Sequence, residues 1–211
     1  MIKTCKPELI LADLKVQCDE APDILINRSL MKAAQKFGSE TCMFDQWIDI
    51  PTQSGVQHYP FERYIPEGFG VQYVTDVKYN GCCIPCLDQS CDEHCKSGYT
   101  LDDMQQITLH GYCPRADQGD PTCRDTLQVR VTLRLRADVC ELPCDMVERF
   151  EEELMDGALG FLLSMKNKKW NDNQAAEFYE NRFAGGLASA KCLLANKMNP
   201  SDQQIPGERM M

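Results

Sequence analysis

One stretch of this sequence is rich in cysteines whose number and spacing could support metal binding or thiol chemistry. Residues 82–95 read Cys-Cys-Ile-Pro-Cys-Leu-Asp-Gln-Ser-Cys-Asp-Glu-His-Cys. Thiolates at short spacing beside an imidazole are the ligands that a tetrahedral zinc site takes. The candidate zinc ligands are Cys83, Cys86, Cys91 and Cys95. Four residues separate the two pairs, whereas ligand pairs in zinc fingers are usually about 12 or more residues apart.

The same cysteines admit two other interpretations, reduced thiols and disulfides. The chain has 13 cysteines, and its N-terminus lacks the apolar core and cleavage site of a secretory leader, so we expect a reducing cytoplasm and free thiols. Disulfides become an option if the protein matures into an extracellular particle. Two further pairs could join the cluster, Cys113 with Cys123 and Cys140 with Cys144. The three states stay open at this point.

Other chemistry-bearing residues favour no enzyme. The segment Cys83-Ile84-Pro85-Cys86 has the form of a thiol-redox motif, but such motifs work at a helix start, where the pKa of the first thiol falls, and this one lies in a turn-rich stretch. No nucleotide-binding or serine-hydrolase motif occurs. The histidines have no metal-ligand spacing: His58, His94 and His110. We therefore predict a protein that is not an enzyme and that carries no cofactor unless zinc binds.

A run of carboxylates could suggest an acid–base site, but helix chemistry explains it more simply. Acidic residues in the first turns of a helix interact favourably with its positive end and solvate its outer face. The same reasoning places basic residues at the other end. The residues concerned are Glu148, Glu151, Glu152, Glu153 and Asp156 at the start, and Lys166, Lys168 and Lys169 at the end.

The charge balance excludes one broad class of function. The net charge is −10, with 32 acidic and 22 basic residues, whereas general nucleic-acid binders gain affinity by neutralising phosphates with Lys and Arg. An acidic surface remains compatible with DNA sliding past without sticking. No stretch reaches the ~18 apolar residues of a membrane helix, so no membrane partner is expected.

A C-terminal helical hairpin over residues 144–198 is the firmest structural prediction. Apolar residues recur at helical spacing on both sides of a polar break at 166–172, which is typical of two antiparallel amphipathic helices. Small residues in the second helix would permit close approach of another helix, in the same chain or in the next subunit. They are Ala184, Gly185, Gly186, Ala188 and Ala190.

The remaining patterns predict two N-terminal helices followed by strands. The helices cover residues 6–18 and 22–37, with Gly38 as a C-terminal cap. Partial or full alternation predicts strands over 43–50, 71–77, 107–112 and 127–136. The expected class is α+β, a helical bundle made by the two ends with a small antiparallel β insertion. Its domains would be 1–41 with 136–198 (bundle), 42–135 (β-rich insertion with the Cys-rich loop) and 199–211 (C-terminal arm).

The hairpin also carries a family resemblance. The motifs run from Leu142-Pro143-Cys144-Asp145 through Phe150-Glu151-Glu152, Gly157-Ala158-Leu159, Leu162-Leu163-Ser164-Met165 and Lys169-Trp170-Asn171-Asp172 to Ala176, Phe178-Tyr179 and Arg182-Phe183. Towards the N-terminus they include Ala21-Pro22-Asp23, Ala33-Ala34 with Phe37, Trp47-Ile48-Asp49-Ile50 and Tyr59-Pro60. Taken together, the chain resembles tailed-bacteriophage head-to-tail adaptor (connector, or head-completion) proteins.

The resemblance implies a structural function in the virion. Such adaptors form a dodecameric ring under the portal, close the filled capsid, present a surface to tail or nozzle proteins and let DNA pass through the lumen at ejection. The protein would be assembled in the host cytoplasm, and the 199–211 arm would reach the portal. Interface candidates are Trp170, Tyr179, Arg182, Gly185 and Gly186. The alternative is a zinc-stabilised protein-binding module that uses the cluster at 82–95, which matches nothing in the family pattern.

Overall fold

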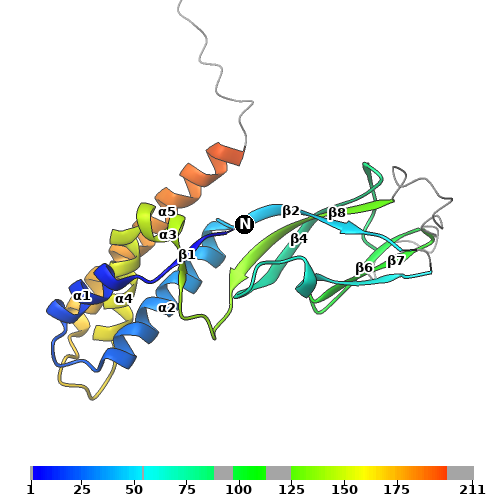
Figure 1. Cartoon of the computed structure of the whole chain (residues 1–211). Coiled ribbons are helices and arrows are strands. Elements are labelled where there is room, and N and C mark those ends of the chain that lie inside the picture. The colour runs from blue at the N-terminus through cyan, green and yellow to red at the C-terminus, as the bar shows by residue number, and fades with distance from the viewer. Residues whose placement is uncertain (1, 54, 88–96, 113–124, 199–211) are drawn as a thin grey trace, which may run out of the picture. The chain divides into compact units, whose positions relative to one another are not determined.

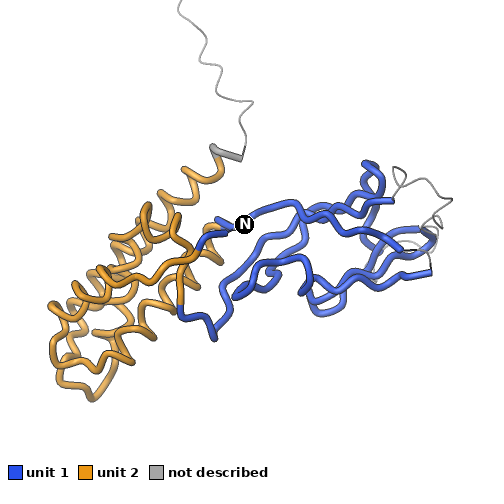
Figure 2. Tube along the Cα trace, viewed as in Figure 1, with its two compact units in different colours: residues 1–3, 42–140 blue, residues 4–41, 141–211 orange. Residues whose placement is uncertain are grey.

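The chain divides into two compact units, one helical and one built of sheets. A computed structural model describes residues 2–53, 55–87, 97–112 and 125–198. Residues 4–41 and 141–211 belong to the helical unit, and residues 1–3 and 42–140 to the sheet unit (Figure 2). The chain therefore passes from the helical unit into the sheet unit and back again.

In its described residues, the helical unit contains five α-helices and a short two-stranded sheet. The helices are α1 (Glu8–Gln17), α2 (Asp23–Thr41), α3 (Cys144–Arg149), α4 (Glu151–Leu163) and α5 (Asn173–Met198), and the strands are β1 (Thr4–Cys5) and β9 (Leu142–Pro143). α4 packs against α2 and α5, and α1 packs on α2 and α4. The expected hairpin is present as α4 and α5, but its first arm is interrupted at Phe150, which separates α3 from α4.

Helix α2 shows how the apolar pattern sets the core of this unit. Leu30, Ala33, Ala34 and Phe37 follow helical spacing and are fully buried. The predicted cap at Gly38 is wrong, because α2 continues to Thr41 and buries Gly38 in its packed face. Cys42 takes the left-handed conformation instead, with a φ of 52°, and ends the helix.

The described part of the sheet unit forms two antiparallel sheets (Figure 1). The strands are β2 (Asp45–Pro51), β3 (His58–Pro60), β4 (Phe69–Tyr79), β5 (Cys82–Cys83), β6 (Gly98–Asp102), β7 (Gln106–His110) and β8 (Thr126–Leu135), with a 3₁₀ turn, η1, at Phe61–Arg63. Their orders are β2-β8-β4-β5 and β3-β7-β6.

Alternation along the central strands builds the core of the sheet unit. On β8, Val129, Val131 and Leu133 are fully buried, and on β7 so are Ile107 and Leu109. Because successive side chains of a strand point to opposite faces, these positions form one apolar face on each sheet. Pairing of β4 with β8 shifts twice, between Val71 and Tyr73 and between Val74 and Asp76, and such bulges increase the local twist.

The expectation of a helical bundle with a small β insertion is wrong. The fold is α+β, but strands make up about 28% of it, in three antiparallel sheets beside five helices. The sheet unit is comparable in length to the helical unit. The expectation rested on strands with clear alternation, and it missed β3, β5 and β6, which are short and are held by pairing with partners elsewhere in the chain.

Candidate assembly surface

The polar loop between α4 and α5 is a cap for both helices. The last carbonyls of a helix lack partners within the helix, and here the indole Nε1–H of Trp170 donates to the Leu162 carbonyl at 3.2 Å. The Asn171 amide donates to the Leu163 carbonyl at 2.8 Å. At the next turn an oxygen of Asp172 accepts hydrogen bonds from the backbone N–H groups of Gln174 and Ala175, both at 3.0 Å, as an N-cap residue does. The Lys-Trp-Asn-Asp motif thus serves the fold.

Gly186 is used within the chain. A Cβ placed there would overlap the Glu153 side chain of α4. On α4 itself, a Cβ at Gly157 would come within 2.9 Å of the Ala33 Cβ and of the Phe183 ring. These glycines bring α2, α4 and α5 close together, so the close approach that small residues permit at Gly186 is that of a helix of the same chain.

Close packing within the chain does not explain the glycine at residue 185. Among the described residues no atom lies within 4 Å of a Cβ placed at Gly185, which is exposed. Glycine in a helix interior costs about 1 kcal/mol relative to alanine, and α5 extends well beyond Gly185 on both sides. The open space lies on the outer side of the helix, where another molecule could approach the backbone.

Gly185 belongs to a row of uncharged residues that covers the outer side of α5. At 100° per residue, the row lies opposite the buried residues Phe183, Leu187 and Ala190. We call it the uncharged stripe, and all its members are exposed: Gln174, Phe178, Asn181, Gly185, Ala188, Ser189 and Cys192. Phe178 leaves 56% of its surface exposed. In a chain with 26% charged residues, an uncharged outer face of this length is typical of a helix that packs against a partner.

A buried carboxylate, that of Asp156, pairs with an arginine that lies beside the stripe. Asp156 of α4 is buried and forms an ion pair with Arg182 of α5, with 3.1 Å between the Arg182 Nε and a carboxylate oxygen. Burial raises the pKa of Asp156, while the Arg182 guanidinium lowers it. The guanidinium also lies 5.8 Å from the ring centre of Phe178. Sequence reasoning grouped Asp156 with the solvated acids, although Leu159 and Gly160, three and four residues further along and therefore on the same helix face, were a signal of burial.

The five interface candidates therefore separate into two groups. Trp170 and Gly186 make contacts within the chain, and the Tyr179 hydroxyl donates to the Gln17 side chain of α1 at 3.4 Å. Gly185 and Arg182 are exposed on the outer side of α5. These two, together with the uncharged stripe, form the candidate assembly surface.

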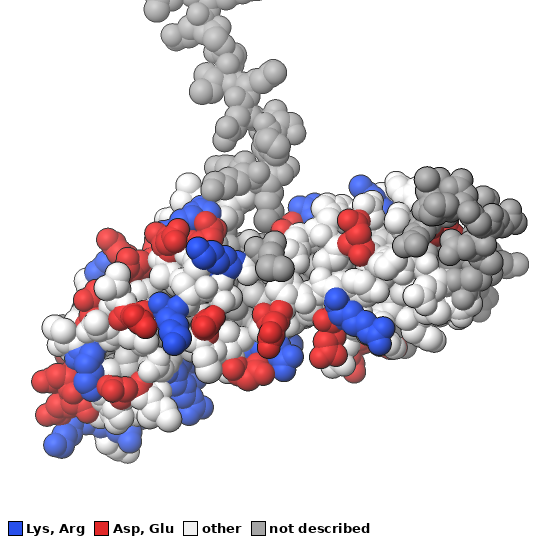
Figure 3. Space-filling view, in the orientation of Figure 1, with Lys and Arg blue, Asp and Glu red and all other residues white. Residues whose placement is uncertain are grey.

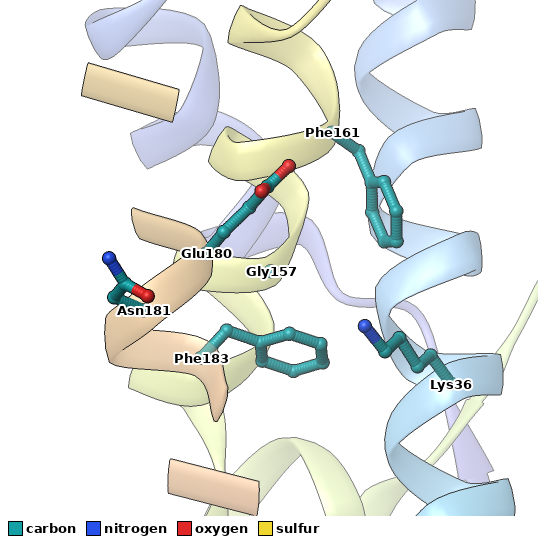
Figure 4. Close-up of a pocket in the computed structure, with 6 residues that line it drawn as sticks. All are labelled: Lys36, Gly157, Phe161, Glu180, Asn181 and Phe183. Carbon is teal, nitrogen blue, oxygen red and sulfur yellow. The ribbon is translucent and has the colours of Figure 1, made fainter. Parts of the chain in front are cut away.

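A pocket of about 310 Å³ opens between α2, α4 and α5. In Figure 4 the rings of Phe161 and Phe183 and the amine of Lys36 converge on it, while Asn181 points away. The Lys36 Nζ lies 5.6 Å from the Phe183 ring centre, a cation–π contact. The lining also includes the carboxylate of Glu180, so the pocket combines two aromatic walls with one cation and one anion.

The zinc candidates are only partly described. Cys83 ends β5 and is exposed. Cys86 forms an isolated backbone β-bridge with Tyr99 of β6. Burial, and then Cys86, raise the pKa of Tyr99 to about 12. Cys91 and Cys95 lie outside the described residues, as do His94, Cys113 and Cys123. Within the described ranges no group of three or more His, Cys, Asp or Glu side chains could hold a metal ion, and the zinc site stays a prediction.

Two histidines are engaged within the sheet unit. The Nδ1 of His58 lies 2.9 Å from the Thr108 hydroxyl oxygen, and the Nε2 of His110 lies 2.9 Å from that of Thr100. Each bond joins neighbouring strands of the β3-β7-β6 sheet. These two histidines therefore contribute to the pairing of the sheet.

Comparison with other proteins gives no family. The chain matches no protein-family model and no curated protein sequence. As far as the structure describes the chain, it contains no helix with the length and apolar character needed to cross a membrane.

Proposed function

We propose that this protein is a virion structural protein, a head-to-tail adaptor that assembles as a ring between portal and tail and lines the DNA exit channel. The observation that carries the proposal is the uncharged stripe of α5, centred on a glycine at which an added Cβ would meet nothing within 4 Å among the described residues. A surface of this kind is suited to repeated helix–helix contact. The resemblance of the hairpin motifs to head-to-tail adaptors supplies the kind of assembly.

The charge of the protein supports a role beside DNA without binding to it. The net charge is −10, and a channel wall that attracted phosphates would slow the passage of DNA. On the face of the helical unit drawn in Figure 3, basic and acidic side chains are interspersed, and no broad basic patch is seen there. DNA would thus pass through the lumen without sequence-specific recognition.

The partners in this proposal are further copies of the chain, the portal protein, and tail or nozzle proteins. The C-terminal arm expected to reach the portal, residues 199–211, lies outside the described residues. Assembly would take place in the host cytoplasm, and the mature location would be the virion.

Ring formation tests the proposal. The full chain, alone and together with the portal protein of the same virus, is examined by sedimentation velocity and negative-stain imaging. We expect closed rings with a central channel in at least one of the two samples. A protein that stays monomeric in both, at every concentration tested, would overturn the adaptor function.

A further inference from the structure

Helix α1 carries a second apolar surface that the fold leaves uncovered. Its inner side buries Ile10 and Leu14 completely. On the opposite side Leu9 and Val16 leave 77% and 82% of their surfaces exposed. Ala12 lies between them at helical spacing and is also exposed. We call Leu9, Ala12 and Val16 the α1 ridge, and a helix that is apolar on both sides is typical of one that is covered on both.

We propose that the α1 ridge of one copy packs on the uncharged stripe of α5 in the next copy. This contact rests on the proposed function and names the two surfaces that meet in its ring. The ridge presents bulky aliphatic side chains, whereas the stripe around Gly185 presents small ones. Leu9 and Val16 are seven residues apart, as are Phe178 and Gly185, so two turns of each helix can align over about 10 Å.

Charge favours the same pairing. Glu8 and Asp13, both exposed, flank the ridge on its two sides. Arg182 borders the stripe, and 48% of its side chain is exposed beside its ion pair with Asp156. An acidic residue of the ridge border placed against Arg182 helps to set the register of a contact whose centre is uncharged, whereas the other border of the stripe is mixed, with Glu177 and Lys191.

Two different surfaces that fit each other link copies head to tail, because each copy offers its ridge to one neighbour and its stripe to the other, and such a chain of contacts forms a ring when the rotation between copies closes. A twofold contact between two ridges would cover α1 but leave Phe178 and the rest of the stripe exposed. One head-to-tail contact covers both surfaces at once. The second copy of the chain is therefore the occupant that the two surfaces fit best.

Two variants block one surface each without changing the net charge. Leu9→Gln with Val16→Gln removes the ridge, and Gly185→Gln fills the stripe. The first changes side chains that are mostly exposed, and the second adds one where the Cβ meets nothing, so both variants should keep the fold, which circular dichroism checks. Ala184→Gln is the matched control, because residue 184 lies on the charged flank of α5, in line with Glu177 and Lys191.

Native mass spectrometry and sedimentation velocity are run under the condition in which the wild type assembles. We expect each variant alone to be monomeric and the control to assemble. A mixture of the two variants should stop at a one-to-one complex of two 24.0 kDa chains, because the first retains the stripe and the second the ridge.

Dimers of the Gly185→Gln variant alone would indicate a ridge–ridge contact and overturn the proposal. Normal assembly of both variants would place the contact elsewhere while leaving the adaptor function standing, whereas a wild type that never assembles would overturn that function itself.

Discussion

The carboxylate of Asp156 is buried in α4, and burial disfavours its charged form. Burial raises its pKa above the ordinary value of 3.8, against the attraction of Arg182. The native state therefore holds the proton more tightly than the unfolded state does. Between 3.8 and the raised pKa, the contribution of Asp156 to the free energy of unfolding falls as the pH rises.

Replacement of Asp156 by asparagine should remove this dependence. The amide oxygen can still accept a hydrogen bond from Arg182, but it carries no charge to desolvate. The stability of Asp156→Asn relative to the wild type should therefore increase as the pH rises from below 3.8 through the raised pKa. Urea denaturation over this range measures it, with the exposed Asp145→Asn as the control. A relative stability that decreased with pH would mean that the attraction of Arg182 outweighs burial.

Two adjacent glycines should respond in opposite ways to the same substitution. Gly185→Ala should stabilise the isolated chain by about 0.5–1 kcal/mol, because alanine favours the helix and the added methyl group meets nothing. Gly186→Ala should destabilise it by about 1–3 kcal/mol, because the methyl group overlaps Glu153. Thermal denaturation of the two variants provides the comparison, and equal shifts in both would contradict the assigned packing of α5.

At the level of elements, the loop between α4 and α5 holds the hairpin together through its side chains. Trp170→Phe keeps an aromatic ring but loses the Nε1–H bond to the Leu162 carbonyl, so the free energy of unfolding should fall by about 1 kcal/mol. Trp170→Ala should lose more, because packing of the half-buried ring is removed as well. Lys169→Ala, an exposed neighbour in the same loop, is the control. If Trp170→Ala leaves stability unchanged but prevents assembly, the residue belongs to an interface between copies.

Helices and strands were predicted correctly where apolar residues repeat at a regular spacing. They were missed where a strand forms only because it pairs with a distant part of the chain. The alternation of Val129, Val131 and Leu133 predicted β8, and helical spacing predicted α2, α4 and α5. The strand β3 has only His58–Pro60 and forms by pairing with β7, about fifty residues further along the chain. Gly38 was predicted to end a helix, but α2 continues to Thr41 and Gly38 is buried within it.

At the level of the whole molecule, the sequence indicated that α5 has a surface that another helix can approach closely, but it did not show which helix that is. The small residues of α5 predicted close approach of another helix, in the same chain or in the next subunit, and at Gly186 that helix is α4 of the same chain, through Glu153. Only the packed structure separates Gly186, which faces α4, from Gly185, which faces outward. The sequence predicted a helix over residues 6–18 but not that Leu9 and Val16 would be exposed while Ile10 and Leu14 are buried.

The proposed ring brings together copies that each carry a net charge of −10, so long-range repulsion opposes its assembly. Its contact surfaces are mostly uncharged and should lose little when salt is added. The Debye length falls from about 10 Å at 0.1 M salt to about 3 Å at 1 M, which screens the repulsion between copies. Association measured by sedimentation velocity should therefore strengthen with rising sodium chloride, and more so in a variant with an added exposed acid, such as Gln57→Glu in the sheet unit. Weaker association at high salt would instead show that ion pairs, rather than the ridge and the stripe, hold the copies together.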